Sequence, residues 1–366
     1  MKEKRKKVLI CPLDWGLGHA TRCIPLIQEL IRQDAEVFIA ATGESGELLK
    51  KEFPAVKYYS LPGVKINYGA DGFSFLKSMM QLPALLFSVR KEHRNVEVLI
   101  KSLDIDIIIS DNRYGLWSEK CYSVLITHQL HIMLPEKMRF MEKMVNRISG
   151  YYIKKFNCCA VPDDADHKVA GELSRPMIDF HHLKYIGILS RFKKTTSSPH
   201  HLITSSQKSY EILVVLSGPE PQRTLLEKLL ITQLLPMKKS ALIVRGLPGN
   251  AIQLPKESTL FFVNHQASQE LNHHLLNSTY IICRSGYSSL MDLAATGRSA
   301  VIIPTPGQTE QEYLAAFHHK NKNHFAMKQD ELNIGYALEK VNQLNSISME
   351  TSISDWVKEL LQKVAV

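Results

Sequence analysis

The sequence has no apolar run long enough to cross a lipid bilayer. A membrane-spanning helix needs about 20 consecutive apolar residues, and none occurs in these 366 residues. The basic segment Met1–Lys7 precedes an apolar run, but Val8–Leu13 contains Cys11 and Pro12 and therefore predicts a strand, not a signal peptide. We expect a cytoplasmic protein, in which any membrane contact is peripheral, at the inner face.

The chain also lacks the cysteine spacing of disulfide frameworks and zinc sites. Its 6 cysteines are scattered, several of them inside apolar runs, which fits a reducing compartment. The formal net charge of +9 suits an anionic partner. Because basic stripes with interleaved aromatic residues and RNP-like patterns are missing, nucleic acid is not expected as that partner.

Length and composition indicate two α/β domains. A chain of 366 residues, 45% hydrophobic and 22% charged, is globular in composition and too long for one compact core. Both halves alternate β-branched runs with helical patterns, which is typical of parallel sheets wrapped by helices. We expect Rossmann-like domains at 1–190 and 210–345, a polar linker at 191–209, and a C-terminal helix at 346–366 that crosses back to the first domain.

The patterns predict individual elements. In the first half they predict strands at Lys7–Cys11, Glu36–Ala40, Val56–Tyr59, Ile105–Ser110, Ser123–Thr127 and Cys158–Val161. They predict helices there at Ala20–Arg32, Glu44–Glu52, Ser74–Leu103 and Lys137–Lys155. The second half has predicted strands at Glu211–Leu216, Ala241–Val244, Tyr280–Cys283 and Ala300–Pro304, and predicted helices at Gln222–Leu235, Gln266–Leu276, Ser288–Thr296, Glu310–Phe325 and Ser354–Val364.

A glycine-rich turn follows the first predicted strand. Gly16 and Gly18 permit a tight turn and close approach of a substrate to the backbone. His19 beside them is a candidate general base, because an imidazole titrates near neutral pH; it could equally cap the helix. Asp111 is a candidate orienting partner, since loops that follow parallel strands meet at one edge of a sheet. Asp111 could also cap its own loop.

Two loops of the second half suit a phosphate-bearing ligand. One has Ser217, Gly218 and Arg223 around a helix start, although a plain N-capped turn has the same composition. In the other, amides and hydroxyls at 285–289 could hold a diphosphate, and Asp292 could accept hydrogen bonds from both ribose hydroxyls. A capping box would explain these serines and this acid almost as well.

Residues 283–292 and 304–312 resemble the C-terminal donor-site signature of glycosyltransferase families 28 and 1, which include the lipid II-forming N-acetylglucosaminyltransferase and UDP-glycosyltransferases. The segment Gly16–His19 resembles the acceptor-side loop of the same enzymes. The resemblance implies an α/β protein of the GT-B fold, with two Rossmann-like domains facing each other across a cleft. It implies an inverting hexosyltransferase that moves a sugar from a nucleoside diphosphate, UDP in our prediction, to an acceptor hydroxyl without a bound metal.

The resemblance also implies residue roles. His19 matches the proposed base, and Asp292 matches the ribose-binding carboxylate, where glutamate is usual. The positions that match the phosphate contacts of the family are Ser217, Gly218, Arg284, Ser288 and Ser289, and those that match its sugar contacts are Gln308, Thr309, Glu310 and Gln311. Arg223, Ser285 and Gly286 are further donor-site candidates from the composition of their own loops. The sequence departs from the lipid II enzyme at Asp14-Trp15, which replaces further glycine, so the acceptor stays open.

Two other patterns have competing interpretations. Basic and apolar residues alternate along Lys137–Lys155, which could lie on an anionic membrane near a lipid-linked acceptor; more often such a helix packs its apolar side on the sheet, and we favour that. The Asp163–Asp166 cluster imitates an Asp-x-Asp metal motif, but we interpret it as a solvated turn.

Two alternative functions remain. A nucleotide-sugar hydrolase or epimerase would use the same fold with a similar glycine and histidine loop. A non-catalytic nucleotide-sugar binding protein or peripheral membrane protein would bind the donor without turnover.

Overall fold

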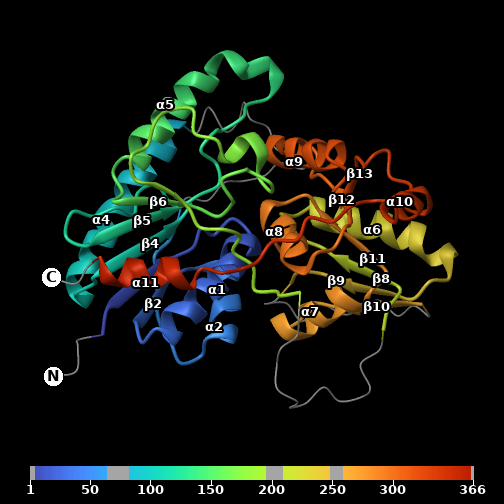
Figure 1. The fold of residues 1–366 in the computed structure, drawn as a ribbon, viewed down its shortest axis with the longest axis horizontal. Coiled ribbons are helices and arrows are strands. Elements are labelled where there is room, and N and C mark those ends of the chain that lie inside the picture. Colours follow the sequence, from blue (N-terminus) through green and yellow to red (C-terminus); the bar gives the residue numbers. More distant parts are fainter. Residues whose placement is uncertain (1–4, 64–81, 195–208, 248–258, 364–366) are drawn as a thin grey trace. The chain divides into compact units, whose positions relative to one another are not determined.

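The computed structural model describes residues 5–63, 82–194, 209–247 and 259–363, which form two compact units (Figure 1). The first unit consists of 5–63, 82–189 and 351–363, and the second of 190–194, 209–247 and 259–350. Each unit has its own sheet and is described separately. The predicted residues Ser74–Gln81 and most of the predicted linker, 195–208, lie outside the described residues.

The first unit is built on a parallel sheet with the order β3-β2-β1-β4-β5-β6-β7. Its strands are β1 Lys7–Cys11, β2 Glu36–Ala40, β3 Lys57–Tyr59, β4 Ile107–Asp111, β5 Tyr122–Ile126, β6 Cys158–Val161 and β7 Leu183–Tyr185. The central strands are almost fully buried along their length, because helices cover both faces. This explains their continuous apolar sequences.

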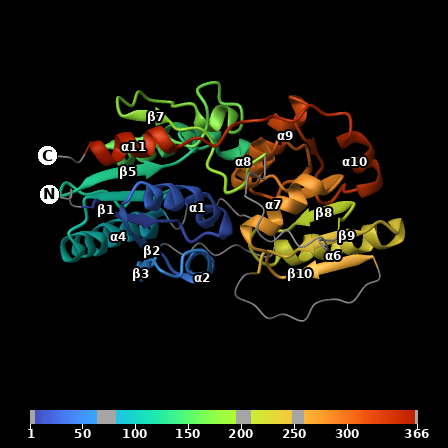
Figure 2. The same cartoon turned by 60° about the horizontal axis from the view of Figure 1, so that its bottom comes forward.

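Helices complete the first unit: α1 Leu17–Arg32, α2 Gly43–Glu52, α4 Leu82–Leu103, α5 Glu142–Ile153 and α11 Ser354–Gln362, with short 3-10 turns at Glu136–Met141 and Gly171–Ser174. Val96 and Ile100 of α4 pack with Leu9 and Ile108 of the sheet in one core cluster. Figure 2 shows α4 and α11 on opposite sides of this sheet.

The terminal helix α11 belongs to the first unit. Trp356, Val357 and Leu360 are buried on one side of it. At its start, Arg32 at the end of α1 donates a hydrogen bond to the Ser354 hydroxyl at 2.8 Å. The chain therefore returns to the first unit after the second one is complete.

The second unit has a parallel sheet with the order β10-β9-β8-β11-β12-β13. Its strands are β8 Ile212–Val215, β9 Ala241–Val244, β10 Leu260–Val263, β11 Tyr280–Arg284, β12 Val301–Ile303 and β13 Phe325–Ala326. Its helices are α6 Gln222–Leu234, α7 Ser268–Asn277, α8 Tyr287–Thr296, α9 Thr309–Lys320 and α10 Ile334–Val341, with a 3-10 turn at Leu235–Met237. Leucines of α6 and the apolar side of α10 share one core with β8, β9 and β12.

One predicted helix is wrong. The segment Lys137–Lys155 is not continuous: a 3-10 turn over Glu136–Met141 precedes α5. No residue of that turn is buried, so no packing supports a regular helix there. The Glu142 carboxylate instead accepts a hydrogen bond from the Leu134 amide at 3.1 Å and so fixes the start of α5 against the preceding loop.

Candidate active site

The glycine-rich turn and the end of β4 lie at the same edge of the first sheet. β1 and β4 are parallel neighbours, so the loops after both leave at their carboxyl ends. Gly16 has a φ of 90°, and nothing lies within 4 Å of a Cβ built there. The turn places Gly18 and His19 in the first helical turn of α1, next to Asp111, the last residue of β4.

His19 and Asp111 are in direct contact. The His19 Nδ1 lies 3.1 Å from Asp111 Oδ2. The Asp111 side chain is 1% exposed, whereas that of His19 is 17% exposed. When the proton is on Nδ1, the ring donates it to Asp111, and Nε2 keeps a lone pair for an incoming proton. Their catalytic roles stay a prediction.

Arg22 joins this pair, although no role was predicted for it from the sequence. Its Nε lies 2.9 Å from each carboxylate oxygen of Asp111. Its Nη2 donates to Asp111 Oδ1 and lies 2.8 Å from His19 Nδ1. Because Nδ1 cannot donate to Asp111 and accept from Nη2 at once, His19 can act as a base at Nε2 only in the tautomer whose Nδ1 proton points to Asp111. Arg22 is 2% exposed. It stands three residues after His19 and therefore on the same side of α1. A charged residue on the buried side of a helix was the signal available in the sequence.

The charges of the three residues determine their protonation. Burial opposes ionisation of Asp111, but Arg22 and His19 outweigh it and hold its pKa at about 2. Burial and the charge of Arg22 lower the pKa of His19 from its ordinary value, against the opposite effect of Asp111. At neutral pH the site therefore contains a carboxylate, a guanidinium and a neutral imidazole.

Asp14, where the sequence departs from the family pattern, supports the same edge. Its Oδ2 accepts a hydrogen bond from Thr42 Oγ1 at 2.8 Å. A Cβ built on Gly43 would meet this carboxylate oxygen at 2.7 Å. The carboxylate thus lies against the N-terminus of α2, where a negative charge is favourable, and it explains why glycine occupies position 43.

The second sheet presents its own loops at its carboxyl edge. β8 and β11 are parallel neighbours; Ser217 and Gly218 follow the first, and Ser285 and Gly286 follow the second. Gly218 has a φ of 103°. Gly286 is the N-cap of α8 and forms no side-chain cap, and Ser288 and Ser289 lie in the first turn of the helix. Backbone amides and hydroxyls are thus gathered at a helix N-terminus, which suits a phosphate group.

The segment after β12 contacts the β11 loop through Gln311. The Ser285 hydroxyl donates to the Gln311 carbonyl oxygen at 2.8 Å. The side-chain oxygen of Gln311 accepts from the Thr305 amide at 2.9 Å, and its Nε2 donates to Gln308 at 2.5 Å. Thr309 and Glu310 begin α9 directly beside this cluster. Hydrogen bonds therefore join Ser285, on the predicted phosphate side, to Gln311 and Gln308, on the predicted sugar side.

The two predicted arginines are engaged elsewhere. Arg284 is 1% exposed and donates to the carbonyl oxygens of Pro304 at 3.1 Å and Gln222 at 2.9 Å. Arg223 donates to Glu220 at 2.7 Å and to Glu227 at 2.6 Å. These contacts favour structural roles over the phosphate contacts expected from the sequence, because a phosphate would have to replace bonds already formed.

Asp292 is held by the segment that begins the second unit. The Ser190 hydroxyl donates to Asp292 Oδ1 at 2.6 Å, and it also accepts from the Phe192 amide at 3.1 Å. Burial raises the pKa of Asp292 to about 6, against the opposite effects of Arg191 and Ser190. A hydroxyl already bound to this carboxylate illustrates the type of contact that a ribose would make.

The Asp163–Asp166 cluster is only in part the predicted solvated turn, because Asp166 is exposed but Asp163 is not. Asp163 is fully buried, and its carboxylate accepts hydrogen bonds from the amide of Ala170 and the hydroxyl of Ser174, both at 2.9 Å. The residue organises its own loop. Among the described residues, no group of three His, Cys, Asp or Glu side chains is arranged for a metal ion.

The comparison with known proteins agrees with this architecture. Residues 250–354 match the glycosyltransferase family 28 C-terminal domain, a range that contains the Ser285, Asp292 and Gln311 loops. An uncharacterized glycosyltransferase of Methanosarcina mazei is 23% identical over 330 residues, covering 85% of this chain and 82% of that protein. The chain is a glycosyltransferase of the GT-B fold.

Two further similarities cover most of this glycosyltransferase. The UDP-N-acetylglucosamine--N-acetylmuramyl-(pentapeptide) pyrophosphoryl-undecaprenol N-acetylglucosamine transferase of Histophilus somni is 22% identical over 320 residues, covering 86% of this chain and 82% of that enzyme. The solved structure of the glycotransferase of kitacinnamycin has a TM-score of 0.62 and 10% identity, covering 99% of this chain and 95% of that one. The fold predicted from the sequence is confirmed.

Proposed function

We propose that this glycosyltransferase moves a sugar from UDP to an acceptor hydroxyl, with inversion and without a bound metal. The observation that carries the proposal is the contact between His19 and Asp111 at the carboxyl edge of the first sheet. A neutral imidazole held by a buried carboxylate is the arrangement that a general base requires. The Histophilus somni relative, whose name includes a UDP-sugar donor, supports the choice of UDP.

The reaction follows from these groups. His19 Nε2 takes the proton of the acceptor hydroxyl while the oxygen attacks the anomeric carbon of the sugar. The bond between that carbon and the diphosphate oxygen breaks on the opposite face, so the configuration inverts. The proton ends on His19, and the negative charge ends on the departing diphosphate.

The second unit would bind the donor. We assign the diphosphate to the amides and hydroxyls at 285–289, the ribose to Asp292, and the sugar to the Gln308–Gln311 segment. Ser217 and Gly218 complete the phosphate side. Stabilisation of the leaving diphosphate by a helix N-terminus and neutral donors needs no metal charge, which is why we expect metal-independent activity.

A calorimetric titration tests the donor assignment. The protein is titrated with UDP, GDP, dTDP and ADP, each with and without magnesium. We expect selective binding of UDP that does not depend on magnesium. Binding of none of the four would contradict the proposal, and binding only with magnesium would contradict its metal-independent part.

A turnover assay separates transfer from hydrolysis. UDP release is measured from UDP-sugars with and without candidate acceptors, including lipid-linked sugars. We expect release that depends on the acceptor and a glycosylated product detectable by mass spectrometry. Release at the same rate without any acceptor would instead identify a nucleotide-sugar hydrolase.

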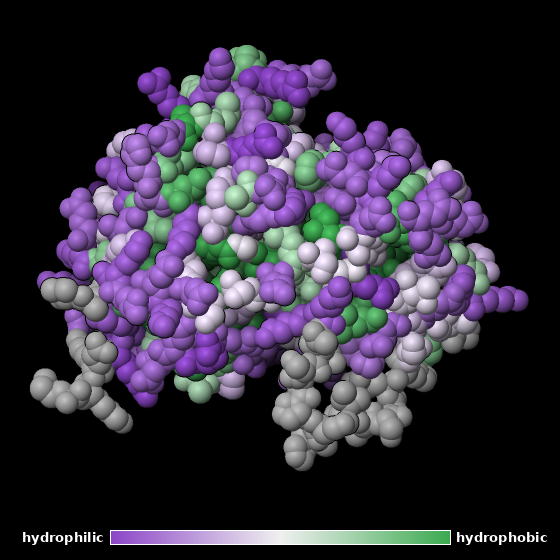
Figure 3. Space-filling view, in the orientation of Figure 1, coloured by the Kyte–Doolittle hydropathy of each residue, from purple (hydrophilic) through white to green (hydrophobic). Residues whose placement is uncertain are grey.

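We also propose that the acceptor is lipid-linked and that the protein binds the membrane surface peripherally. Within the described residues, no helix is both long and apolar enough to span a bilayer. Phe140, Met144 and Tyr151 are 81%, 45% and 60% exposed. Figure 3 shows hydrophobic groups among hydrophilic ones over this part of the molecule, at the top of the view.

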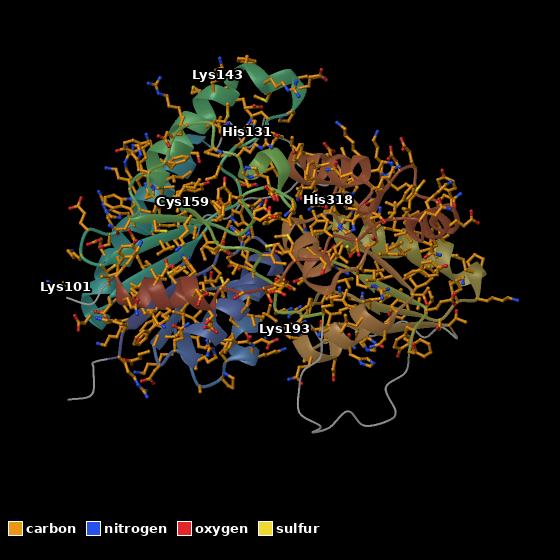
Figure 4. All side chains as sticks on the ribbon, viewed as in Figure 1. Lys101, His131, Lys143, Cys159, Lys193 and His318 are labelled. Carbon is orange, nitrogen blue, oxygen red and sulfur yellow. The ribbon has the colours of Figure 1, made fainter. Side chains whose placement is uncertain are left out.

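Basic residues surround these apolar side chains. The exposed cations of the segment are Lys137, Arg139, Lys143, Arg147, Lys154 and Lys155. Figure 4 shows Lys143 on the outer part of this segment, with His131 nearer the body of the unit. Apolar side chains among cations suit a surface of anionic lipid. This favours the membrane interpretation of the segment more than the sequence alone did.

Vesicle sedimentation tests this surface. We expect binding to vesicles that contain phosphatidylserine and little binding to pure phosphatidylcholine. Phe140→Ser combined with Tyr151→Ser should reduce binding to the anionic vesicles. Leu225→Ser is the matched control, because Leu225 is 45% exposed on α6 of the second unit. Equal loss in both variants would contradict a dedicated membrane surface.

A further inference from the structure

The buried cluster around Asp111 contains one more positive group than a simple His–Asp pair. Asp111 accepts hydrogen bonds from Arg22 through both carboxylate oxygens. The same carboxylate lies 3.1 Å from His19. Asp111 and Arg22 are almost completely buried, so water screens neither charge effectively.

The negative charge of Asp111 could be balanced by either of two groups, a protonated His19 or Arg22. In an isolated His–Asp pair, the imidazole is the only group that can balance the buried carboxylate, so protonation of histidine is favoured. Here the guanidinium of Arg22 already supplies a permanent positive charge. A second positive charge on His19 would face Arg22 Nη2 at 2.8 Å, which is an unfavourable contact between like charges.

We propose that Arg22 is a positioning residue that balances the charge of Asp111, so that His19 stays neutral and ready to accept a proton. This inference rests on the proposed role of His19 as a base. It adds a third member to the pair and gives that member a separate role. Asp111 orients the imidazole, and Arg22 balances the carboxylate charge that would otherwise favour protonation of the imidazole.

The other groups that face this cluster do not supply the same charge. Cys23, on the same helix, directs its thiol toward Asp111 Oδ2 at 3.8 Å, and burial raises its pKa well above the ordinary value, so it stays a neutral thiol. His128, after β5, has its Nδ1 3.4 Å from Arg22 Nη1. Among these neighbours, Arg22 alone carries a fixed positive charge.

The inference agrees with the directions in which both pKa values move. Asp111 has its pKa held at about 2 and His19 has its pKa lowered. In an isolated pair the carboxylate would raise the pKa of the imidazole instead. Loss of the guanidinium charge should therefore raise the pKa of His19, so that the base becomes protonated, and inactive, over a wider range of acidic pH.

Three variants test this charge balance. Arg22→Gln removes the charge but keeps a long polar side chain, Arg22→Lys keeps the charge with different geometry, and Asp111→Asn removes the carboxylate. The first readout is the titration of the His19 ring by nitrogen-15 NMR, which needs no substrate. The second is the pH dependence of kcat/KM for transfer, measured from pH 5 to 9 on the full chain.

We expect the His19 pKa in Arg22→Gln to rise by about 1 or more, since one buried charge typically moves the pKa of a neighbour by that amount. At low pH, activity should then fall about tenfold for every pH unit by which this pKa rises, and it should recover at high pH. Arg22→Lys should titrate close to the wild type. In Asp111→Asn the His19 pKa should fall further.

The outcomes separate this inference from the proposed function. An unchanged His19 titration in a folded Arg22→Gln protein would overturn the inference even if transfer is observed. So would an equal rise of the His19 pKa in Arg22→Lys and Arg22→Gln, because geometry and not charge would then be responsible. If Arg22→Gln does not fold, the Lys and Asn variants decide: a His19 pKa that rises in Asp111→Asn would contradict the charge balance. Absence of transfer with the expected titrations would refute only the proposed function.

Discussion

The carboxyl edges of the two sheets present different chemical groups to a ligand. In the first unit, the edge holds ionisable groups in direct contact, with Arg22 and His19 both against Asp111. In the second unit, the edge presents hydroxyls, amides and a helix N-terminus at Ser285–Ser289. The same parallel architecture therefore suits proton transfer at one edge and anion binding at the other.

The arginines show the same difference. Arg22 in the first unit bonds the carboxylate of the proposed catalytic pair, whereas Arg284 in the second unit is used on backbone carbonyl oxygens. A cation beside a proposed phosphate site is therefore not by itself a phosphate ligand. In the second unit Asp292 is a half-buried acid whose pKa is raised to about 6, and a neutral hydroxyl, that of Ser190, donates to it.

Replacing the proposed base His19 should have the largest effect on turnover, because it removes the proton-transfer group at the edge of the first sheet. His19→Ala should lower kcat on the order of 10²- to 10⁴-fold, because general base catalysis contributes that much. UDP affinity by calorimetry should stay within about twofold, since the proposed donor contacts lie in the other unit. His181→Ala is the matched control: His181 lies 3.8 Å from Asp179, but both are exposed. Equal kcat values in wild type and His19→Ala would refute the base assignment.

Replacing Asp292, the residue proposed to bind the ribose, should impair donor binding at the edge of the second sheet. Asp292→Ala should weaken UDP binding by about 1.5–3 kcal/mol, the usual contribution of hydrogen bonds to a charged group, or about 10- to 150-fold in Kd. Asp330→Ala, an exposed acid in the same unit, controls for the change in charge. Loss of turnover in Asp292→Ala with unchanged donor affinity would argue against a ribose contact.

The pH dependence of donor binding should sharpen the difference between Asp292 and Asp111, the acids of the two sheet edges. The pKa of Asp292 is raised to about 6, so its carboxylate is charged above that pH and protonated below it. Affinity for a UDP-sugar should fall by up to about tenfold for each pH unit below 6. A UDP-sugar is the suitable probe, because a terminal phosphate also titrates near pH 6. Asp292→Asn should bind with little pH dependence; a slope equal to that of the wild type would assign the titration to another group.

Most of the fold could be predicted because the buried strands are continuous apolar runs with a helical pattern after each. Three strands, β7, β10 and β13, were missed. β7 has three residues and β13 has two, so neither is long enough for a periodic pattern. β10 has four residues, as many as the predicted strand β9, so its length does not explain why it was missed. Helix α10 was missed although Asn333 caps it through the Tyr336 amide at 3.1 Å, a start signal present in the sequence.

The site could be predicted only in part. Parallel topology brings the loops after β1 and β4 to one edge, which is why His19 and Asp111 could be paired from sequence. The role of Arg22 depends on which side of α1 is buried, and the engagement of Arg284 depends on carbonyl groups at Gln222 and Pro304. Such contacts join residues far apart in the chain and have no local sequence signal.

The smallest expected effect is a difference in protein stability, which compares how closely the edges of the two sheets are packed. Gly43 has a φ of 59°, and a Cβ there would approach the Asp14 carboxylate to 2.7 Å; Gly286 has no positive φ, and its nearest neighbour would be Gln311 Nε2 at 4.0 Å. Gly43→Ala should therefore destabilise the protein by about 1–3 kcal/mol through backbone strain and crowding, whereas Gly286→Ala should leave stability within about 0.5 kcal/mol. Urea denaturation of both variants measures the difference. Since Gly286 lies at the proposed phosphate site, its variant should lose UDP affinity while keeping stability. Equal destabilisation by both substitutions would mean that the second edge is packed as closely as the first and is not open to a ligand.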